Sequence, residues 1–168
     1  MEPHKPRLWK SRTASYPGTL FTCARPGRSK GADQDVPDNL VCKWIKGLPD
    51  AEGRTIVSLL GRKHGRGGMS GFSFYSFYGE FDTESERRRR GSFQEFVDTS
   101  NKGSPIKVLQ FPTYDFKPIP PETLDAVTAA ILERLSAGET VILVDSGGET
   151  RTKAVCKHLG FIEDSATR

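Results

Sequence analysis

The residues of this sequence with the clearest capacity for chemistry lie in one stretch, residues 140–160, which reads TVILVDSGGETRTKAVCKHLG. The stretch opens on the apolar, β-branched run Val141–Val144, and a run of this kind predicts a fully buried, parallel strand. The polar segment Asp145–Arg151 follows, and its two glycines allow the chain to turn sharply. Lys153–Leu159 then has helical spacing, with Gly160 placed to end a helix. The sequence therefore predicts a strand, a glycine turn and a helix in direct succession.

Such a succession is suited to binding an anion. Backbone N–H groups converge in a tight turn, and the N-terminus of the following helix adds positive electrostatic potential. Arg151, at the exit of the turn, can contact two oxygens of one phosphate because its guanidinium is planar and forked. The predicted phosphate-binding residues are Ser146, Gly147, Gly148, Glu149, Thr150 and Arg151.

The stretch resembles the phosphate-binding loop of cysteine-dependent protein tyrosine and dual-specificity phosphatases. In that family the loop reads His-Cys, five residues, Arg, then Ser or Thr, and it follows a buried strand and opens a helix. Arg151 and Thr152 match the last two positions, and Ser146–Thr150 supply the five residues between. Val144 and Asp145 depart from the pattern, because they stand where the family has its His and its nucleophilic Cys.

A second part of the chain extends the resemblance. Phe111-Pro112 leads into a loop that contains Asp115, and a proline-started amphipathic helix, an Ala-Gly-Glu turn and the buried strand follow. This is the order and spacing of the dual-specificity phosphatases. In that family the Asp of the loop after the Phe-Pro strand is the general acid, and the resemblance implies that role for Asp115. The resemblance spans roughly residues 16–160, whereas the family's further helices behind the loop are expected to be shortened or missing after Gly160.

The residue at the nucleophile position decides the expected activity. A cysteine works there because the positive field of the loop lowers the pKa of its thiol. A carboxylate is a poor nucleophile toward phosphate and also repels it. One like-charge pair ~4 Å apart costs about 4 kcal/mol at an effective dielectric of ~20, and a dianion faces about twice that. We therefore expect negligible cysteine-type turnover, with Asp145 occupying the loop as a phosphate mimic and pairing with Arg151. Asp145 is interpreted as natural divergence rather than an introduced catalytic mutation.

Size and composition limit the remaining possibilities. A chain of 168 residues is expected to form one domain, with a flexible arm over residues 1–15 and a single phosphatase-like domain over 16–168. The net charge of +4 and pI near 9.0 mildly favour anionic partners. No apolar stretch is long enough to span a membrane, and the N-terminus lacks the apolar core of a secretory signal. A cytoplasmic location is therefore expected.

The cysteines point to the same compartment. Cys23, Cys42 and Cys156 are an odd number at no metal-ligand spacing, and they are expected to be free thiols in a reducing compartment. No disulfide framework, zinc site or other metal is predicted. No cofactor is expected either.

Helices and strands are expected to alternate along the chain. Strands are predicted at 19–24, 55–60, 106–112 and 141–144, and helices at about 38–46, 83–97, 121–137 and 153–159. On the last helix, Ala154, Val155, His158 and Leu159 are expected to lie along one side. This order predicts an α/β domain with a central, mostly parallel sheet of four to five strands flanked by helices.

Three functions fit these patterns. The first is a catalytically silent phosphatase-like domain that binds a phosphorylated protein, another phosphomonoester or a protein partner. The second is an active phosphatase in which Asp145 forms an acyl-phosphate and Asp115 is the acid and base. The third, which the sequence favours least, is a nucleotide- or nucleic-acid-binding domain that uses the basic, glycine-rich loop Gly61–Gly71 and the aromatic cluster of residues 72–81. In any of these functions, an acidic partner could contact Arg87, Arg88, Arg89 and Arg90.

Overall fold

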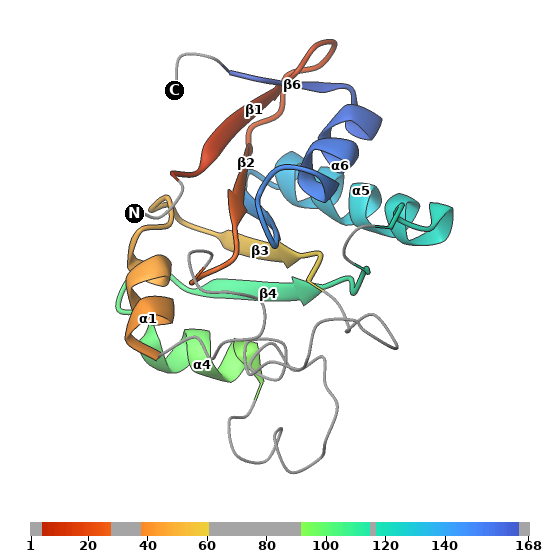
Figure 1. Cartoon of the computed structure of the whole chain (residues 1–168). Helices are drawn as coiled ribbons and strands as arrows, with labels where there is room; N and C mark the ends of the chain where they lie inside the picture. Colours follow the sequence, from red (N-terminus) through yellow and green to blue (C-terminus); the bar gives the residue numbers. More distant parts are fainter. Residues whose placement is uncertain (1–4, 28–37, 61–91, 115–116, 165–168) are drawn as a thin grey trace.

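A computed structural model of the chain describes residues 5–27, 38–60, 92–114 and 117–164 (Figure 1). In these residues the chain forms strands and helices of a mixed α/β domain, which confirms the predicted fold class. The strands are β1 (Arg7–Ser11), β2 (Thr19–Ala24), β3 (Arg54–Ser58), β4 (Ile106–Gln110), β5 (Thr140–Asp145) and β6 (Phe161–Glu163). The helices are α1 (Asp38–Lys46), α4 (Phe93–Ser100), α5 (Pro121–Ser136) and α6 (Arg151–Leu159).

The strands form one sheet in the order β4-β3-β5-β2-β1-β6. The four strands from β4 to β2 run parallel, as predicted. β1 and β6 extend the sheet antiparallel beyond β2, so that the sheet has six strands among the described residues rather than four to five. β5 lies between β3 and β2 and is buried over its whole length, as expected for the centre of a parallel sheet.

The N-terminal segment differs from the expected flexible arm. Residues 7–11 form β1, and the buried indole of Trp9 donates a hydrogen bond to Thr22 Oγ1 at 2.8 Å. β1 in turn pairs with β6, whose Phe161 is buried beside Trp9 in the same core cluster. Residues 7–11 are therefore part of the sheet, where they pair with β2 and β6 and Trp9 packs in the core.

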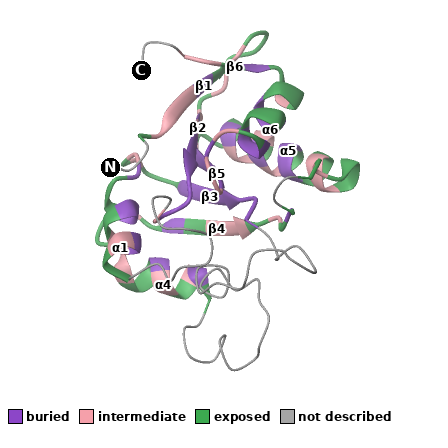
Figure 2. Ribbon diagram, in the orientation of Figure 1, coloured by how far each residue is buried: buried purple, intermediate pink, exposed green. Residues whose placement is uncertain are grey.

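Side chains on the two faces of the sheet belong to two separate core clusters. Ile142 and Val144 of β5 pack in the cluster that contains the buried residues of α1 and α4. Val141 and Leu143 pack in the cluster of α5 and α6. The alternation of side chains along a strand thus divides the apolar run of β5 between both helical layers. Figure 2 shows β5 and β3 buried between the two pairs of helices.

Two helices show features that the sequence pattern did not predict. In α6 the buried residues are Arg151, Thr152, Val155 and Cys156, whereas Ala154 and His158 are exposed. The described part of α4 begins after Ser92, which forms a capping box with Glu95. The first part of the helix predicted at 83–97 lies outside the described residues, which begin again at Ser92.

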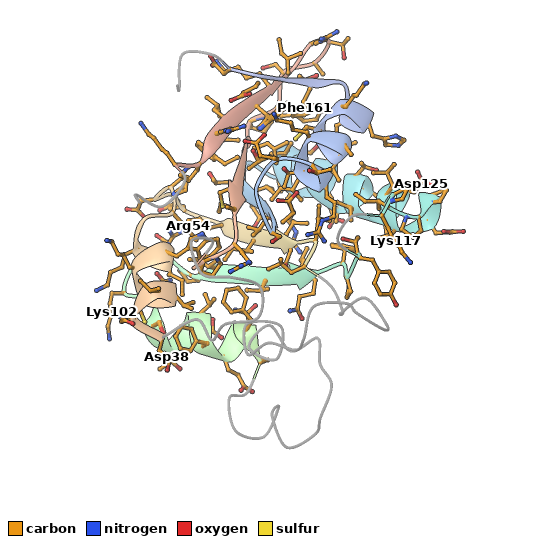
Figure 3. All side chains as sticks on the ribbon, in the orientation of Figure 1. Asp38, Arg54, Lys102, Lys117, Asp125 and Phe161 are labelled. Atoms are coloured by element: carbon orange, nitrogen blue, oxygen red, sulfur yellow. The ribbon has the colours of Figure 1, made fainter. Side chains whose placement is uncertain are left out.

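A buried arginine ties together two loops at the amino end of β3. The Arg54 guanidinium donates hydrogen bonds to Ser104 O at 2.7 Å, Pro49 O at 3.1 Å and Asn101 Oδ1 at 3.4 Å. Pro49 follows α1, and the other two residues follow α4, so one side chain fixes the ends of both helices on this face. Figure 3 labels Arg54 at the start of β3.

We expect Arg54→Met to lower the free energy of unfolding by about 2–4 kcal/mol, because the loss of the donors leaves buried carbonyl groups without partners. Urea unfolding followed by circular dichroism measures this. Lys107→Met on the neighbouring strand β4, where the side chain is exposed, is the matched control and should change stability little. Equal effects of the two substitutions would contradict the assigned role of Arg54.

Candidate functional site: the loop after β5

The predicted turn lies at the carboxyl end of β5, in the middle of the sheet. β2, β3 and β4 run parallel to β5, so their carboxyl ends lie on the same side, which is where open α/β sheets usually bind ligands. Residues 146–150 form the turn, and α6 begins immediately afterwards at Arg151. The predicted strand, turn and helix are therefore present and adjacent.

The Asp145 carboxylate points into this turn and is bound by its backbone. Only 1% of Asp145 is exposed. Its Oδ2 accepts a hydrogen bond from the Thr152 backbone N–H at 2.9 Å, and its Oδ1 accepts one from the Gly148 backbone N–H. The N-cap residue of α6, Thr150, makes no side-chain capping hydrogen bond. The Asp145 carboxylate thus accepts a hydrogen bond from an N–H group in the first turn of α6. In many helices the side chain of the N-cap residue is the acceptor for such a group.

Arg151 lies across the ends of the neighbouring strands. Its Nη1 donates hydrogen bonds to Thr113 Oγ1 at 2.9 Å and to Leu59 O at 3.1 Å. Leu59 follows β3 and Thr113 follows β4, and Arg151 is itself buried. The predicted pairing of Asp145 with Arg151 is not among the ion pairs between described residues. Backbone amides bind the Asp145 carboxylate, and a carbonyl and a hydroxyl accept hydrogen bonds from the Arg151 guanidinium.

Thr152, the other residue that matches the phosphatase pattern, is completely buried at the start of α6. Its backbone N–H donates to Asp145, but its hydroxyl has no hydrogen-bond partner among the described residues. A buried hydroxyl without a partner is uncommon and costs free energy. Asp145 therefore accepts a hydrogen bond from the Thr152 backbone but none from the Thr152 hydroxyl.

Gly148 allows the turn to lie directly against β2. Its φ of 69° is in the left-handed region. A Cβ atom at this position would lie 2.6 Å from Ala24 N and 2.8 Å from Cys23 C, both backbone atoms. Residue 148 must therefore be glycine for two reasons, backbone conformation and space.

We expect Gly148→Ala to lower the free energy of unfolding by clearly more than Gly138→Ala, since both glycines have positive φ but a Cβ at Gly138 would meet no atom within 4 Å. The left-handed conformation alone costs roughly 1–2 kcal/mol for alanine, so the excess at Gly148 reports the close approach to β2. Thermal unfolding of the two variants measures the difference. Similar losses would show that the turn can move away from β2.

Glu149 forms ion pairs with two cations. It forms ion pairs with Arg7 of β1 and, at 2.7 Å, with Lys153 Nζ one turn later in α6. The hydrogen bond from Lys153, followed by the contact with Arg7, lowers the pKa of Glu149. The predicted phosphate-binding role of Glu149 is untested, but its charge is compensated by these neighbours.

The folded state lowers the pKa of Glu149, so its ion pairs stabilise the protein above the carboxyl's unfolded-state pKa of about 4.3. This contribution is lost as the pH falls through the lower folded-state value. Because the side chains are about half exposed, we expect Glu149→Gln to cost about 0.5 kcal/mol at pH 7.

The cost of Glu149→Gln should shrink toward zero as the pH falls below about 4. Chemical denaturation at several pH values measures it. Glu52→Gln is the control, because exposed Glu52 makes no ion pair with another described residue. A cost that does not depend on pH would contradict the assignment.

Two of the three cysteines, Cys23 and Cys156, are buried free thiols, whereas Cys42 is partly buried. Burial raises the pKa of both thiols, and the nearby charge of Asp145 raises the pKa of Cys23 further. Both thiols therefore stay protonated at neutral pH and pack as small apolar side chains.

Several predicted features lie outside the described residues. They are Asp115, Arg87 to Arg90, the loop Gly61–Gly71 and the aromatic cluster of residues 72–81.

Tyr114, next to Asp115, is 45% exposed, with Lys117 Nζ 5.5 Å from the centre of its ring. A separate cavity of about 470 Å³ lies at the opposite end of the sheet, lined by residues that include Trp9, Tyr16 and Phe161. No predicted site residue lines this cavity.

The sequence reasoning missed two residues that shape the loop. Thr113 binds Arg151, and Arg7 binds Glu149. Thr113 could have been found, since it directly follows a predicted strand whose carboxyl end was expected beside the loop. Arg7 gave no such signal, because its segment was expected to be an arm.

Comparisons with known proteins give little further information. No family model matches the sequence, and no curated protein matches it. A crystal structure described as Tk-PTP in the active form is similar to this chain, with 14% sequence identity and a TM-score of 0.46. The match covers 93% of this chain and 71% of that chain.

Among the described residues, no helix is both long and apolar enough to cross a membrane.

Proposed function

We propose that this chain is a phosphatase-like domain whose phosphate loop is occupied by its own acidic residue, so that it binds a protein or phosphorylated partner instead of hydrolysing phosphate esters. The single observation that supports this most is the position of Asp145. Its carboxylate accepts hydrogen bonds from amides of the loop and of α6, in the strand, turn and helix where the family pattern has a nucleophile. Arg151 and Thr152 follow at the matching positions.

The electrostatics favour an occupied loop over catalysis. A phosphate dianion entering the turn would meet the buried carboxylate at short range, and the repulsion of about 8 kcal/mol at ~4 Å exceeds what one bidentate arginine contact returns. The amides of Gly148 and Thr152 also already have an acceptor. A phosphate would therefore have to displace Asp145 from them before it could bind.

The remaining residues have defined places in this proposal. Arg151 is a buried cation at the carboxyl ends of the strands, and Asp115 keeps the general-acid position that the resemblance implies. No metal or cofactor is required. The same proposal includes an acidic protein partner that contacts Arg87, Arg88, Arg89 and Arg90. It also includes a cytoplasmic location.

We expect the natural chain to show no measurable hydrolysis of a chromogenic phosphomonoester, and Asp145→Cys to gain turnover. A thiolate at position 145 restores the nucleophile that the family pattern has there. Asp125→Cys on α5, where the aspartate side chain is 77% exposed (Figure 3), is the matched control and should remain inactive. Turnover by the natural chain that Asp145→Asn abolishes would instead establish an active enzyme with an acyl-phosphate mechanism.

Removal of the carboxylate should also free the loop for anions. Asp145→Ser is expected to bind inorganic phosphate at least tenfold more tightly than the natural chain, since it removes the repulsion and releases two amides. Isothermal calorimetry at fixed ionic strength measures the affinity. Equal binding by both chains would show that Asp145 does not occupy a phosphate site.

A further inference from the structure

Thr113 connects Arg151 to the end of β3 through two hydrogen bonds. The Thr113 hydroxyl donates to Leu59 O at 2.6 Å and accepts from Arg151 Nη1 at 2.9 Å. Arg151 Nη1 also reaches the same Leu59 carbonyl at 3.1 Å. The three groups form a closed triangle of hydrogen bonds, and both Thr113 and Arg151 are at most 5% exposed.

This triangle restricts the orientation of the guanidinium. A hydroxyl has one hydrogen to donate, and in Thr113 it is directed at Leu59 O, so the oxygen lone pairs face Arg151. The guanidinium is planar, so fixing one of its nitrogens at two acceptors also fixes the direction of the others. The Thr113 backbone N–H donates to Leu59 O as well, at 3.3 Å, which holds the segment after β4 against the end of β3.

We propose that Thr113 is a positioning residue for Arg151, and that its hydroxyl sets the anion affinity of the loop after β5. The proposal rests on the proposed function, in which this loop is a phosphate site occupied by Asp145. Thr113 itself need not touch the anion. It acts by holding the arginine in one direction before the anion arrives, which reduces the entropy lost on binding.

The first test uses the Asp145→Ser background, in which the loop is free. Addition of Thr113→Val should weaken phosphate binding about tenfold, which corresponds to the loss of one hydrogen bond to a charged group. Thr113→Ser keeps the hydroxyl and should keep the affinity. Thr128→Val on α5 is the matched control, because within the described part of the chain the Thr128 hydroxyl bonds to carbonyls of its own helix. Equal phosphate affinity with threonine and valine at position 113 would overturn the proposal.

A second measurement in the natural chain does not depend on phosphate. Thr113→Val should speed the exchange of the Arg151 guanidinium protons with water, as seen by nuclear magnetic resonance with Arg151→Lys used for assignment, and Thr113→Ser should not. Unchanged exchange in Thr113→Val would overturn the positioning role even if phosphate binds. If Asp145→Ser binds no phosphate while the exchange changes as expected, the positioning role stands and the proposed phosphate site falls.

Discussion

The arrangement of the loop depends on one interaction, the contact of a buried carboxylate with the backbone amides that follow it. Asp145 ends the central strand, and its side chain reaches forward to Gly148 and to the second residue of α6. The contact joins strand, turn and helix without any other side chain. It also places a negative charge where the N-terminus of a helix is electrostatically positive, which stabilises both. In the proposed function, the same contact leaves the loop a poor site for a second anion.

The parallel sheet determines which groups can meet this loop. Because β5 lies between β3 and β2, residues that follow β2, β3 and β4 all reach the same end of the sheet. Ala24 and Cys23 of β2 limit residue 148 to glycine, whereas Leu59 and Thr113 fix Arg151. A carboxylate and a guanidinium from one loop are therefore held by different partners, and each has satisfied hydrogen bonds without the other.

Charges around the loop are compensated locally. Glu149 is balanced by Arg7 and Lys153, which also connects the loop to β1. The nearby thiol of Cys23 stays protonated because burial and the charge of Asp145 both disfavour a thiolate. Among the described residues, Asp145, Arg151 and Arg25, which directly follows β2, are the buried charged groups at this end of the sheet.

The sequence by itself determined the central elements and the order of the site. The apolar run before Asp145 predicted a buried strand, and the glycines and Arg151 that follow it predicted an anion-binding turn before a helix. Those signals are local, since periodicity and turn chemistry depend on neighbours in the chain. They also predicted that Asp145 would occupy the turn, because a carboxylate there has amide donors within reach.

Only the tertiary structure decided which distant groups bind the loop residues. Arg151 was expected to pair with Asp145, but the ends of β3 and β4 provide a carbonyl and a hydroxyl that accept from its guanidinium instead. The N-terminal segment was expected to be mobile, but Trp9 packs in the core and β1 brings Arg7 to Glu149. These contacts join residues far apart in the chain, and no local pattern encodes them, because they depend on which strands the folded sheet places side by side.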